Sequence, residues 1–212
     1  MKKAGTMSRS LKILLCVFWL VAIILPLIRM LSTMAGVDIA AVIGARKFSR
    51  ALRQSLTVSF AATAISVGLA GILSWAVART NVKHKTILNT LITVPMLIPS
   101  ISHGMGLVII LGANGWLSRL VGLTSGIYGF WGIVSGSVMY SFPVAYLMLY
   151  DVLAYEDGTP YEAAEVMGLK TRDRFFAITL PYLRKPLISV VFATFTMIIT
   201  DYGVPLMVGG NI

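Results

Sequence analysis

Five long apolar runs, separated by short polar segments, decide what this chain can fold into. They extend over about residues 13–31, 52–77, 86–111, 128–149 and 186–208. A hydrocarbon core of about 30 Å is crossed by about 20 helical residues, which is close to the length of each run. Helices also satisfy their backbone hydrogen bonds internally, as a lipid environment requires. The sequence therefore predicts an all-α fold, a polytopic transmembrane helical bundle with five visible spans.

The composition excludes several other classes of protein. Apolar residues make up 57% of the chain and charged residues 12%, against roughly 45–50% and about 25% in soluble domains. The net charge is +10, but the basic residues lie in short clusters between apolar runs, so we expect no nucleic-acid partner. One cysteine, Cys16, and two histidines, His84 and His103, provide neither a disulfide framework nor a multi-histidine metal site. We expect this chain to bind no metal and no cofactor.

Small residues and prolines mark the interiors of the runs. Residues 59–71 (SFAATAISVGLAG) place alanine, serine and glycine at spacings of three and four. Such spacing lets membrane helices approach closely, and this stretch predicts a helix-packing face. Pro95, Pro99 and Pro143 also lie inside runs, where neighbouring helices can satisfy the freed backbone groups.

Lysine and arginine set the predicted orientation, because short cytoplasmic loops carry the excess of both. With the N-terminus inside, twelve of these residues are cytoplasmic and five are outside, and Arg29 is expected to snorkel outward. The cytoplasmic ones are Lys2, Lys3, Arg9, Lys12, Arg79, Lys83, Lys85, Lys170, Arg172, Arg174, Arg184 and Lys185. The outer ones are Arg46, Lys47, Arg50, Arg53 and Arg119. The sequence therefore predicts a multi-pass protein with a cytoplasmic N-terminus.

The first outer loop and the N-terminus each leave an alternative open. The four basic residues at 46–53 indicate an amphipathic stretch at the membrane surface, or else a site that attracts an anionic substrate or an acidic docking protein. The basic N-terminus and its apolar run also have the form of a cleaved signal peptide. That run continues past Pro26 with no clean cleavage site before Arg29, which favours a retained span.

Residues 155–185 form the one long segment that is not apolar. Thr159 and Glu162 have the spacing of a capping box, and Pro160 suits the first helical position. Gly168 is placed to end this helix in a left-handed conformation. A second helix is predicted to start at Thr171 and to run to Pro181. A helix of two turns is too short to be stable alone in water, so the first one is expected to dock on a partner.

The spacing within this segment carries a resemblance to a known family. The fixed positions are Glu162-Ala163-Ala164, then Gly168, then Ile178 and Leu180-Pro181. They resemble the EAA motif of the inner-membrane permeases of binding-protein-dependent ABC importers. Seven fixed positions at ordinary residue frequencies match by chance about once in 10^8 start positions.

The resemblance implies a fold, a mechanism and a set of partners. Residues 52–212 would be an incomplete permease core with the coupling loop at 155–185, preceded in 1–51 by an N-terminal tail, a first transmembrane helix and an outer loop. The coupling residues would be Glu162, Ala163, Ala164, Gly168, Ile178, Leu180 and Pro181. The implied partners are cytosolic ABC ATPase subunits, a periplasmic or extracellular solute-binding protein, membrane lipid and a second permease half, which is fused, identical or different. The chain would be a transport subunit of the bacterial inner membrane and not an enzyme, with ATP bound and hydrolysed by the partner.

A weaker resemblance lies at the C-terminal end. The stretch 200–205 (TDYGVP), followed by Gly209, Gly210 and Asn211, is similar to permeases of the ferric-iron and 2-aminoethylphosphonate type. It implies one of those solutes, and a truncated chain that is the first half of a double-length permease. Spermidine/putrescine, thiamine and sulfate permeases are near relatives in pattern.

Two polar residues within the runs are candidates for the translocation path. Asp201 lies about fifteen residues into the last run, roughly 22 Å along a helix, and an ionisable residue in a span indicates function. The alternative is that the helix unwinds near Gly203 and Pro205 and that Asp201 caps its end. His103 is either a substrate contact or a hydrogen-bonded packing residue.

Three other functions are alternatives to the importer. The first is an ion-gradient-driven secondary transporter with Asp201 as its coupling acid. The second, an integral-membrane enzyme, is disfavoured by the shortage of histidine and of clustered acids. The third, a membrane scaffold, leaves the spacing from Glu162 to Pro181 unexplained. The chain has no GxxxxGK[ST] phosphate loop, so ATP hydrolysis is expected to come from a partner.

Overall fold

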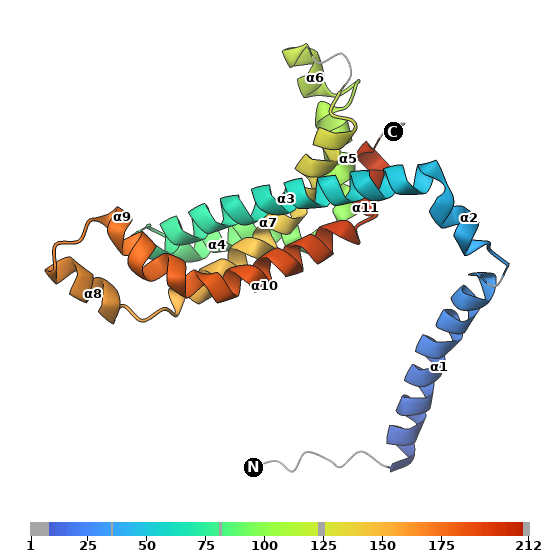
Figure 1. The fold of residues 1–212 in the computed structure, drawn as a ribbon, viewed down its shortest axis with the longest axis horizontal. Helices are drawn as coiled ribbons and strands as arrows, with labels where there is room; N and C mark the ends of the chain where they lie inside the picture. Colours follow the sequence, from blue (N-terminus) through green and yellow to red (C-terminus); the bar gives the residue numbers. More distant parts are fainter. Residues whose placement is uncertain (1–8, 35, 81, 123–125, 210–212) are drawn as a thin grey trace. The chain divides into compact units, whose positions relative to one another are not determined.

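The structure is a computed structural model that describes residues 9–34, 36–80, 82–122 and 126–209 (Figure 1). These ranges contain helices and no strand, which confirms the predicted all-α class. The elements are α1 (Arg9–Met34), α2 (Ile39–Gly44), α3 (Arg46–Arg79), α4 (Lys85–Thr93), the 3₁₀ turn η1 (Val94–Leu97), α5 (Ser100–Leu111), α6 (Trp116–Val121), α7 (Phe130–Ala154), α8 (Thr159–Val166), α9 (Thr171–Arg174), the π turn η2 (Phe175–Thr179), α10 (Leu180–Ile199) and α11 (Gly203–Val208). Lys2, Lys3 and residues 210–212 lie outside the described residues.

Within the described residues, five helical segments have the length and composition to cross a membrane. They are Leu11–Thr33, Arg46–Arg79, Ser100–Val121, Phe130–Ala154 and Thr171–Ile199. The predicted number of five is therefore confirmed. The third and fifth differ from the expected ranges, and prolines explain both differences.

The third expected span is wrong as a single helix, because it breaks between α4 and α5. The break contains Pro95 and Pro99, which have no N–H to donate and clash with the preceding turn of a helix. A proline also pushes the residue before it out of the helical region, and Ile98 is extended at φ −93° and ψ 133°. The membrane-length segment therefore begins at Ser100.

The fifth expected span is also wrong as a single helix. α9, η2 and α10 follow one another directly from Thr171, and α10 ends at Ile199. A helix continuing through this point would need an N–H from Pro205 to bond the carbonyl of Asp201, and proline has none. A new short helix, α11, therefore starts at Gly203. The separate second helix predicted to end at Pro181 is corrected in the same way, since it continues into α10.

The chain separates into two compact units, Met1–Ala51 and Leu52–Ile212. In the first unit, α1 runs through Pro26 without a break and exposes its apolar side chains. α2 is capped by Asp38, whose carboxylate accepts a hydrogen bond from the Ala41 N–H at 3.1 Å. An exposed apolar surface of this length is what a helix surrounded by lipid requires.

In the second unit, α7 runs alongside α3, α4 and α10 (Figure 1). It contributes to two apolar clusters. One cluster joins α7 to α5, α11 and the end of α10, and the other joins it to Leu183 and Val190 of α10. Residues of α3 belong to both clusters. The predicted small-residue face of α3 is confirmed, because Ala62, Ser66 and Ala70 are fully buried. Ser66 hydrogen-bonds Ser141 of α7 at 2.8 Å. Close approach of these two helices thus rests on small side chains.

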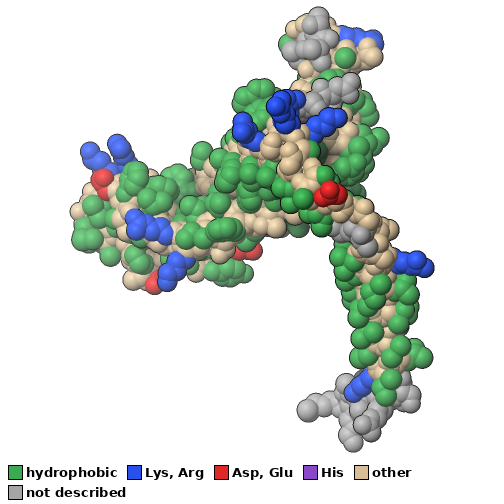
Figure 2. Space-filling model, turned by 45° about the vertical axis from the view of Figure 1, so that its right-hand side comes forward, with side chains coloured by type: hydrophobic (Ala, Val, Ile, Leu, Met, Phe, Trp, Pro, Cys, Tyr) green, Lys and Arg blue, Asp and Glu red, His purple; other side chains and the backbone are tan. Residues whose placement is uncertain are grey.

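The two ends of the second unit differ in chemistry. In Figure 2 its sides are mostly apolar, charged side chains of both signs gather at the end that holds α8 and α9, and basic side chains are also seen toward the opposite end. That end contains Glu165, Arg172, Asp173 and Arg174. The arrangement matches a bundle whose sides face lipid and whose charged end faces water.

Candidate functional site

α8 is the short helix on which the EAA resemblance falls, and its start differs from the predicted capping box. The Asp157 carboxylate accepts hydrogen bonds from the Thr159 backbone N–H at 3.0 Å and from the Thr159 hydroxyl at 2.7 Å. The N–H of Glu162 bonds the Gly158 carbonyl instead of the Thr159 side chain. The capping box is therefore wrong, because α8 begins at Thr159 with Gly158 as its N-cap, and the Thr159 hydroxyl donates to Asp157. The Thr159 backbone and hydroxyl donors hold the pKa of Asp157 below its ordinary value.

The end of α8 follows the prediction. Gly168 has φ +72°, in the left-handed region that favours glycine. The Leu169 N–H bonds the Ala164 carbonyl at 3.0 Å, and the Gly168 N–H bonds the Glu165 carbonyl at 2.9 Å. This pair of bonds is the Schellman motif, which satisfies carbonyls that a helix end leaves free.

α8 has an inner and an outer face. Ala164 is 1% exposed and packs toward the rest of the second unit, whereas Val166 is 90% exposed and Met167 is 71% exposed. Glu162 and Ala163 are exposed as well. The helix thus presents a bare outer surface of apolar and acidic groups.

The structure divides the seven predicted coupling residues between two places. Glu162, Ala163, Ala164 and Gly168 lie on α8 or at its end, as expected. Ile178 lies in η2 and is half-buried, while Leu180 and Pro181 begin α10. The second group therefore belongs to the helix that leads from the loop back into the bundle.

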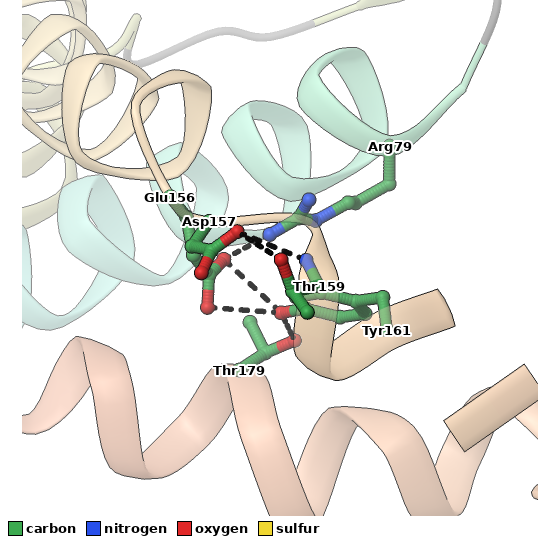
Figure 3. Close-up of polar contacts among 6 residues, drawn as sticks. All are labelled: Arg79, Glu156, Asp157, Thr159, Tyr161 and Thr179. Atoms are coloured by element: carbon green, nitrogen blue, oxygen red, sulfur yellow. Dashed lines mark hydrogen bonds and ion pairs between the residues drawn. The ribbon is translucent and has the colours of Figure 1, made fainter. Parts of the chain in front are cut away.

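Four polar residues that the sequence did not single out fasten the inner face of α8 (Figure 3). We call them the Tyr161 junction: Arg79, Glu156, Tyr161 and Thr179. The Arg79 guanidinium forms an ion pair with Glu156 and lies over the Tyr161 ring, 4.0 Å from its centroid. The Tyr161 hydroxyl is 3.1 Å from both Glu156 carboxylate oxygens and 2.6 Å from the Thr179 hydroxyl. No local spacing reveals this set, because its members lie up to 100 residues apart.

The protonation of Tyr161 fixes the direction of these hydrogen bonds. Burial raises the pKa of Tyr161 above its ordinary value, and the Thr179 hydrogen bond and the Arg79 charge offset part of that rise. The phenol is therefore neutral at physiological pH and has one proton to donate. An ionised carboxylate only accepts, so Tyr161 donates to Glu156 and receives a hydrogen bond from Thr179.

The π turn η2 lies beside this junction. Its Phe175 ring meets the Trp75 ring of α3 edge to face, with ring centroids 5.7 Å apart. Just before it, Arg174 donates to the Leu169 carbonyl at 2.8 Å and to the Glu165 carboxylate at 3.1 Å. Single π turns within α-helices are frequent at functional sites. The start of α10 is thus tied to both α8 and α3.

The second candidate site is the break between α10 and α11. The Asp201 carboxylate accepts a hydrogen bond from the Ser100 hydroxyl at 2.5 Å and others from the backbone N–H groups of Gly203 and Val204 at 3.3 and 3.0 Å. Asp201 therefore caps α11 and joins it to the start of α5, as the capping alternative expected. A role for Asp201 in the translocation path stays a prediction. Breaks at membrane depth occur where the backbone is buried in protein or lines a cavity.

His103 lies one turn along α5 from Ser100. It is 6% exposed, and its Nδ1 lies 3.3 Å from the Pro99 carbonyl oxygen. Its ring centroid is 6.3 Å from that of Tyr140. This placement fits a hydrogen-bonded packing histidine, and a substrate contact stays a prediction. Among the described residues, no group of three or more His, Cys, Asp or Glu side chains is arranged to hold a metal ion.

Comparison with known proteins agrees with this arrangement. Residues 68–212 match the family described as binding-protein-dependent transport system inner membrane component. A molybdenum transport system permease protein of Azotobacter vinelandii is 27% identical over 165 residues, which cover 76% of this chain and 73% of that protein. A spermidine/putrescine transport system permease protein homolog of Mycoplasma genitalium is 29% identical, covering 80% of this chain and 58% of that protein. The sulfate transport system permease protein of Escherichia coli is 27% identical, covering 76% and 59%.

A solved structure shares the fold. The crystal structure of a bacterial ABC transporter involved in the import of the acidic polysaccharide alginate superposes with a TM-score of 0.69. The match covers 90% of this chain and 72% of that chain at 15% identity. It supports the bundle architecture of the permease type.

These findings confirm the resemblance drawn from the EAA spacing, at the level of the family. The finer type is not confirmed, because the relatives named above are permeases for molybdenum, spermidine/putrescine and sulfate rather than for ferric iron or 2-aminoethylphosphonate. The family is one of transport components, as the sequence predicted, and not of enzymes. The chain belongs to the inner-membrane components of binding-protein-dependent transport systems.

Proposed function

We propose that this protein is the transmembrane permease subunit of an ATP-driven importer in the bacterial inner membrane, with its N-terminus in the cytoplasm. The bundle forms the translocation pathway, and α8 is the coupling helix. The observation that carries the proposal is the two-sided environment of α8. Its inner face is fastened to the bundle, while Val166 and Met167 on its outer side are exposed.

The outer face of α8 supports docking on a cytosolic ATPase. A helix of two turns gains its stability from packing, and an apolar surface left bare in water favours burial in a partner. ATP binding closes two ATPase subunits, and the groove that holds α8 moves with them. Differential contact of α8 with the open and closed ATPase states supplies the free energy that moves the bundle.

The proposed partners follow from the same assignment. They are two cytosolic ABC ATPase subunits, which bind the ATP, an external solute-binding protein, a second permease half and membrane lipid. A solved relative of the same fold is described as a bacterial alginate ABC transporter in complex with an alginate pentasaccharide-bound periplasmic protein. That description supports an external binding protein as the source of solute.

For the solute we propose an oxyanion of the molybdate or sulfate class. Two of the relatives named above are named for molybdenum and for sulfate transport. The four basic residues at 46–53, predicted on the outer side, add a positive field that favours an anion. The 200–205 stretch is the feature that favours ferric iron or 2-aminoethylphosphonate instead, and the Mycoplasma relative favours a polyamine. All four classes belong in the uptake assay.

The test is transport by the native complex in sealed proteoliposomes. The complex is purified in mild detergent, its subunits are identified by mass spectrometry, and uptake of each solute class is measured with its binding protein. We expect a copurifying ATPase and uptake that needs ATP and continues when ion gradients are collapsed. Uptake that needs an ion gradient and survives ATP depletion would replace this proposal with the secondary-transporter alternative.

A further inference from the structure

The Tyr161 junction connects α8 to three different helices of the bundle. Arg79 is the last residue of α3, and Glu156 lies two residues after the end of α7. Thr179 is the last residue of η2, directly before α10. A side chain of α8, Tyr161, meets all three of these residues through the contacts shown in Figure 3. The inner face of α8 is therefore linked to α3, α7 and α10 at one point.

The hydrogen bonds of the Tyr161 junction lead to the Glu156 carboxylate. The Thr179 hydroxyl donates to Tyr161, Tyr161 donates to Glu156, and Arg79 donates to the same carboxylate. In each of these hydrogen bonds, the donor and the acceptor thus belong to different elements. Hydrogen bonds to a charged group are stronger than neutral ones, so the carboxylate is the centre of the set.

Because the Glu156 carboxylate is buried, separating it from its hydrogen-bond partners is costly. The Glu156 side chain is only 4% exposed, and the Thr179 side chain is fully buried. A buried carboxylate that loses its partners is left without compensation, and that state is costly. The low-energy response to a displacement of Tyr161 is therefore for Glu156, Arg79 and Thr179 to move with it.

We propose that the Tyr161 junction transmits the displacement of the coupling helix to α3, α7 and α10 together. This inference rests on the function proposed above and adds to it the residues that pass the movement on. Tyr161, Arg79, Glu156 and Thr179 are positioning residues, since the proposal has them act through α8. The outer face of α8 binds the ATPase, and the junction on its inner face makes the bundle follow.

The test separates transmission from docking. Tyr161→Phe keeps the ring beneath Arg79 but removes the hydroxyl that joins Glu156 to Thr179. We expect the reconstituted complex with this variant to bind the ATPase as wild type does and to hydrolyse ATP. The amount of solute moved per ATP hydrolysed is expected to fall about fivefold or more, the range of ordinary coupling between two sites.

Two further variants make the result specific. Thr179→Val keeps the shape of the side chain without its hydroxyl and is expected to show the same loss, whereas Thr179→Ser restores the hydroxyl and is expected to recover most of the coupling. Tyr155→Phe is the matched control, because Tyr155 lies in the same loop and is 88% exposed. Its coupling is expected to equal that of wild type.

Two outcomes would overturn the inference. One is wild-type transport per ATP in both Tyr161→Phe and Thr179→Val. The other is loss of the ATPase from those two complexes, which would make the junction a support for docking rather than a transmitter. Failure of the proposed function gives a different result, because wild-type uptake would then be independent of ATP before any variant is compared.

Discussion

α8 and α11 are both short helices that meet the long helices of the second unit, yet they are held in opposite ways. α8 is fastened by polar side chains on one face and is bare on the other. α11 lies against α5 and α7 with Val204 and Val208 fully buried. A satisfied buried polar network joins its elements rigidly, and the bare outer face of α8 is open to a partner. α8 is thus arranged to move together with the helix ends that it contacts, whereas α11 is held in one close-packed arrangement.

Glycines show how tightly α11 is enclosed. A Cβ on Gly203 would lie 2.6 Å from the Ser100 hydroxyl oxygen and 2.7 Å from the Ile101 backbone nitrogen. A Cβ on Gly104 would lie 2.8 Å from the Cβ of Met207. By contrast, a Cβ on Gly168, at the end of α8, would meet no atom within 4 Å. The glycines near α11 are needed because no side chain fits there, whereas Gly168 is needed because its backbone is left-handed.

The largest effect is expected from Gly203→Ala. The added methyl group meets backbone atoms of α5, which cannot rotate away, and overpacking of this kind costs about 1–3 kcal/mol. Gly106→Ala in α5 is the matched control, because its Cβ would meet no atom within 4 Å. The midpoint of thermal unfolding in detergent is expected to fall for the first and not for the second. Equal midpoints would show that α11 is not tightly enclosed.

The next effect is expected from Gly168→Val. A β-branched residue at positive φ is strained by about 1–2 kcal/mol, so the end of α8 distorts while the bundle stays folded. Gly168→Asn, which tolerates this conformation, is the comparison. ATPase association and uptake are expected to drop for the valine variant and to remain near wild type for asparagine. Unchanged uptake in the valine variant would count against a coupling role for α8.

A smaller effect is expected from Asp201→Ala. The loss of a helix cap costs about 0.5–2 kcal/mol, and it leaves the Ser100 hydroxyl without this acceptor. Asp201→Asn keeps an oxygen that caps α11 but removes the charge. If capping is the whole role of Asp201, the asparagine variant transports normally. Impaired transport in an asparagine variant that still inserts and assembles would support the translocation-path prediction.

The smallest effect is expected from Asp157→Asn at the start of α8. The pKa of Asp157 is lowered in the folded protein, so its carboxylate stabilises α8 at any pH above the ordinary value and loses this effect as the pH falls through the lowered value. The wild-type advantage over Asn, measured as a difference in unfolding midpoint, is expected to be constant between pH 6 and pH 8. A difference that changes across this window would assign the pH dependence to another group.

Sequence periodicity and spacing predicted the parts that depend on local chemistry. The apolar runs gave the number of spans, the small residues around Ser66 gave a packing face, and Gly168 gave a helix end. The EAA spacing predicted the family. Each of these follows from residues that are close together in the chain.

The parts that were missed depend on distant partners or on competition between them. The break near Pro99 was missed, because only the packing of neighbouring segments decides whether a membrane helix continues through a proline. The break near Pro205 was expected only as one of two alternatives. The Thr159 capping box does not form, because α8 begins at Thr159 and the Thr159 hydroxyl donates to the carboxylate of Asp157. The Tyr161 junction joins residues from three segments, and nothing in the local pattern marks Arg79 or Glu156 as its members.

The π turn η2 determines which side chains at the start of the segment formed by α9, η2 and α10 lie on the same side of the helix. In a regular α-helix, residues five apart are separated by about 140° around the axis. A π turn bonds residue i to residue i+5 and so brings such residues onto one side. Arg174 and Thr179 are five apart, and both reach the loop of α8, the first at Leu169 and Glu165 and the second at Tyr161. The extra residue in this turn therefore places Arg174 and Thr179 on the same side of one helix, where both contact the loop of α8. Deleting one residue there would break either the Arg174 contacts or the Thr179 contact.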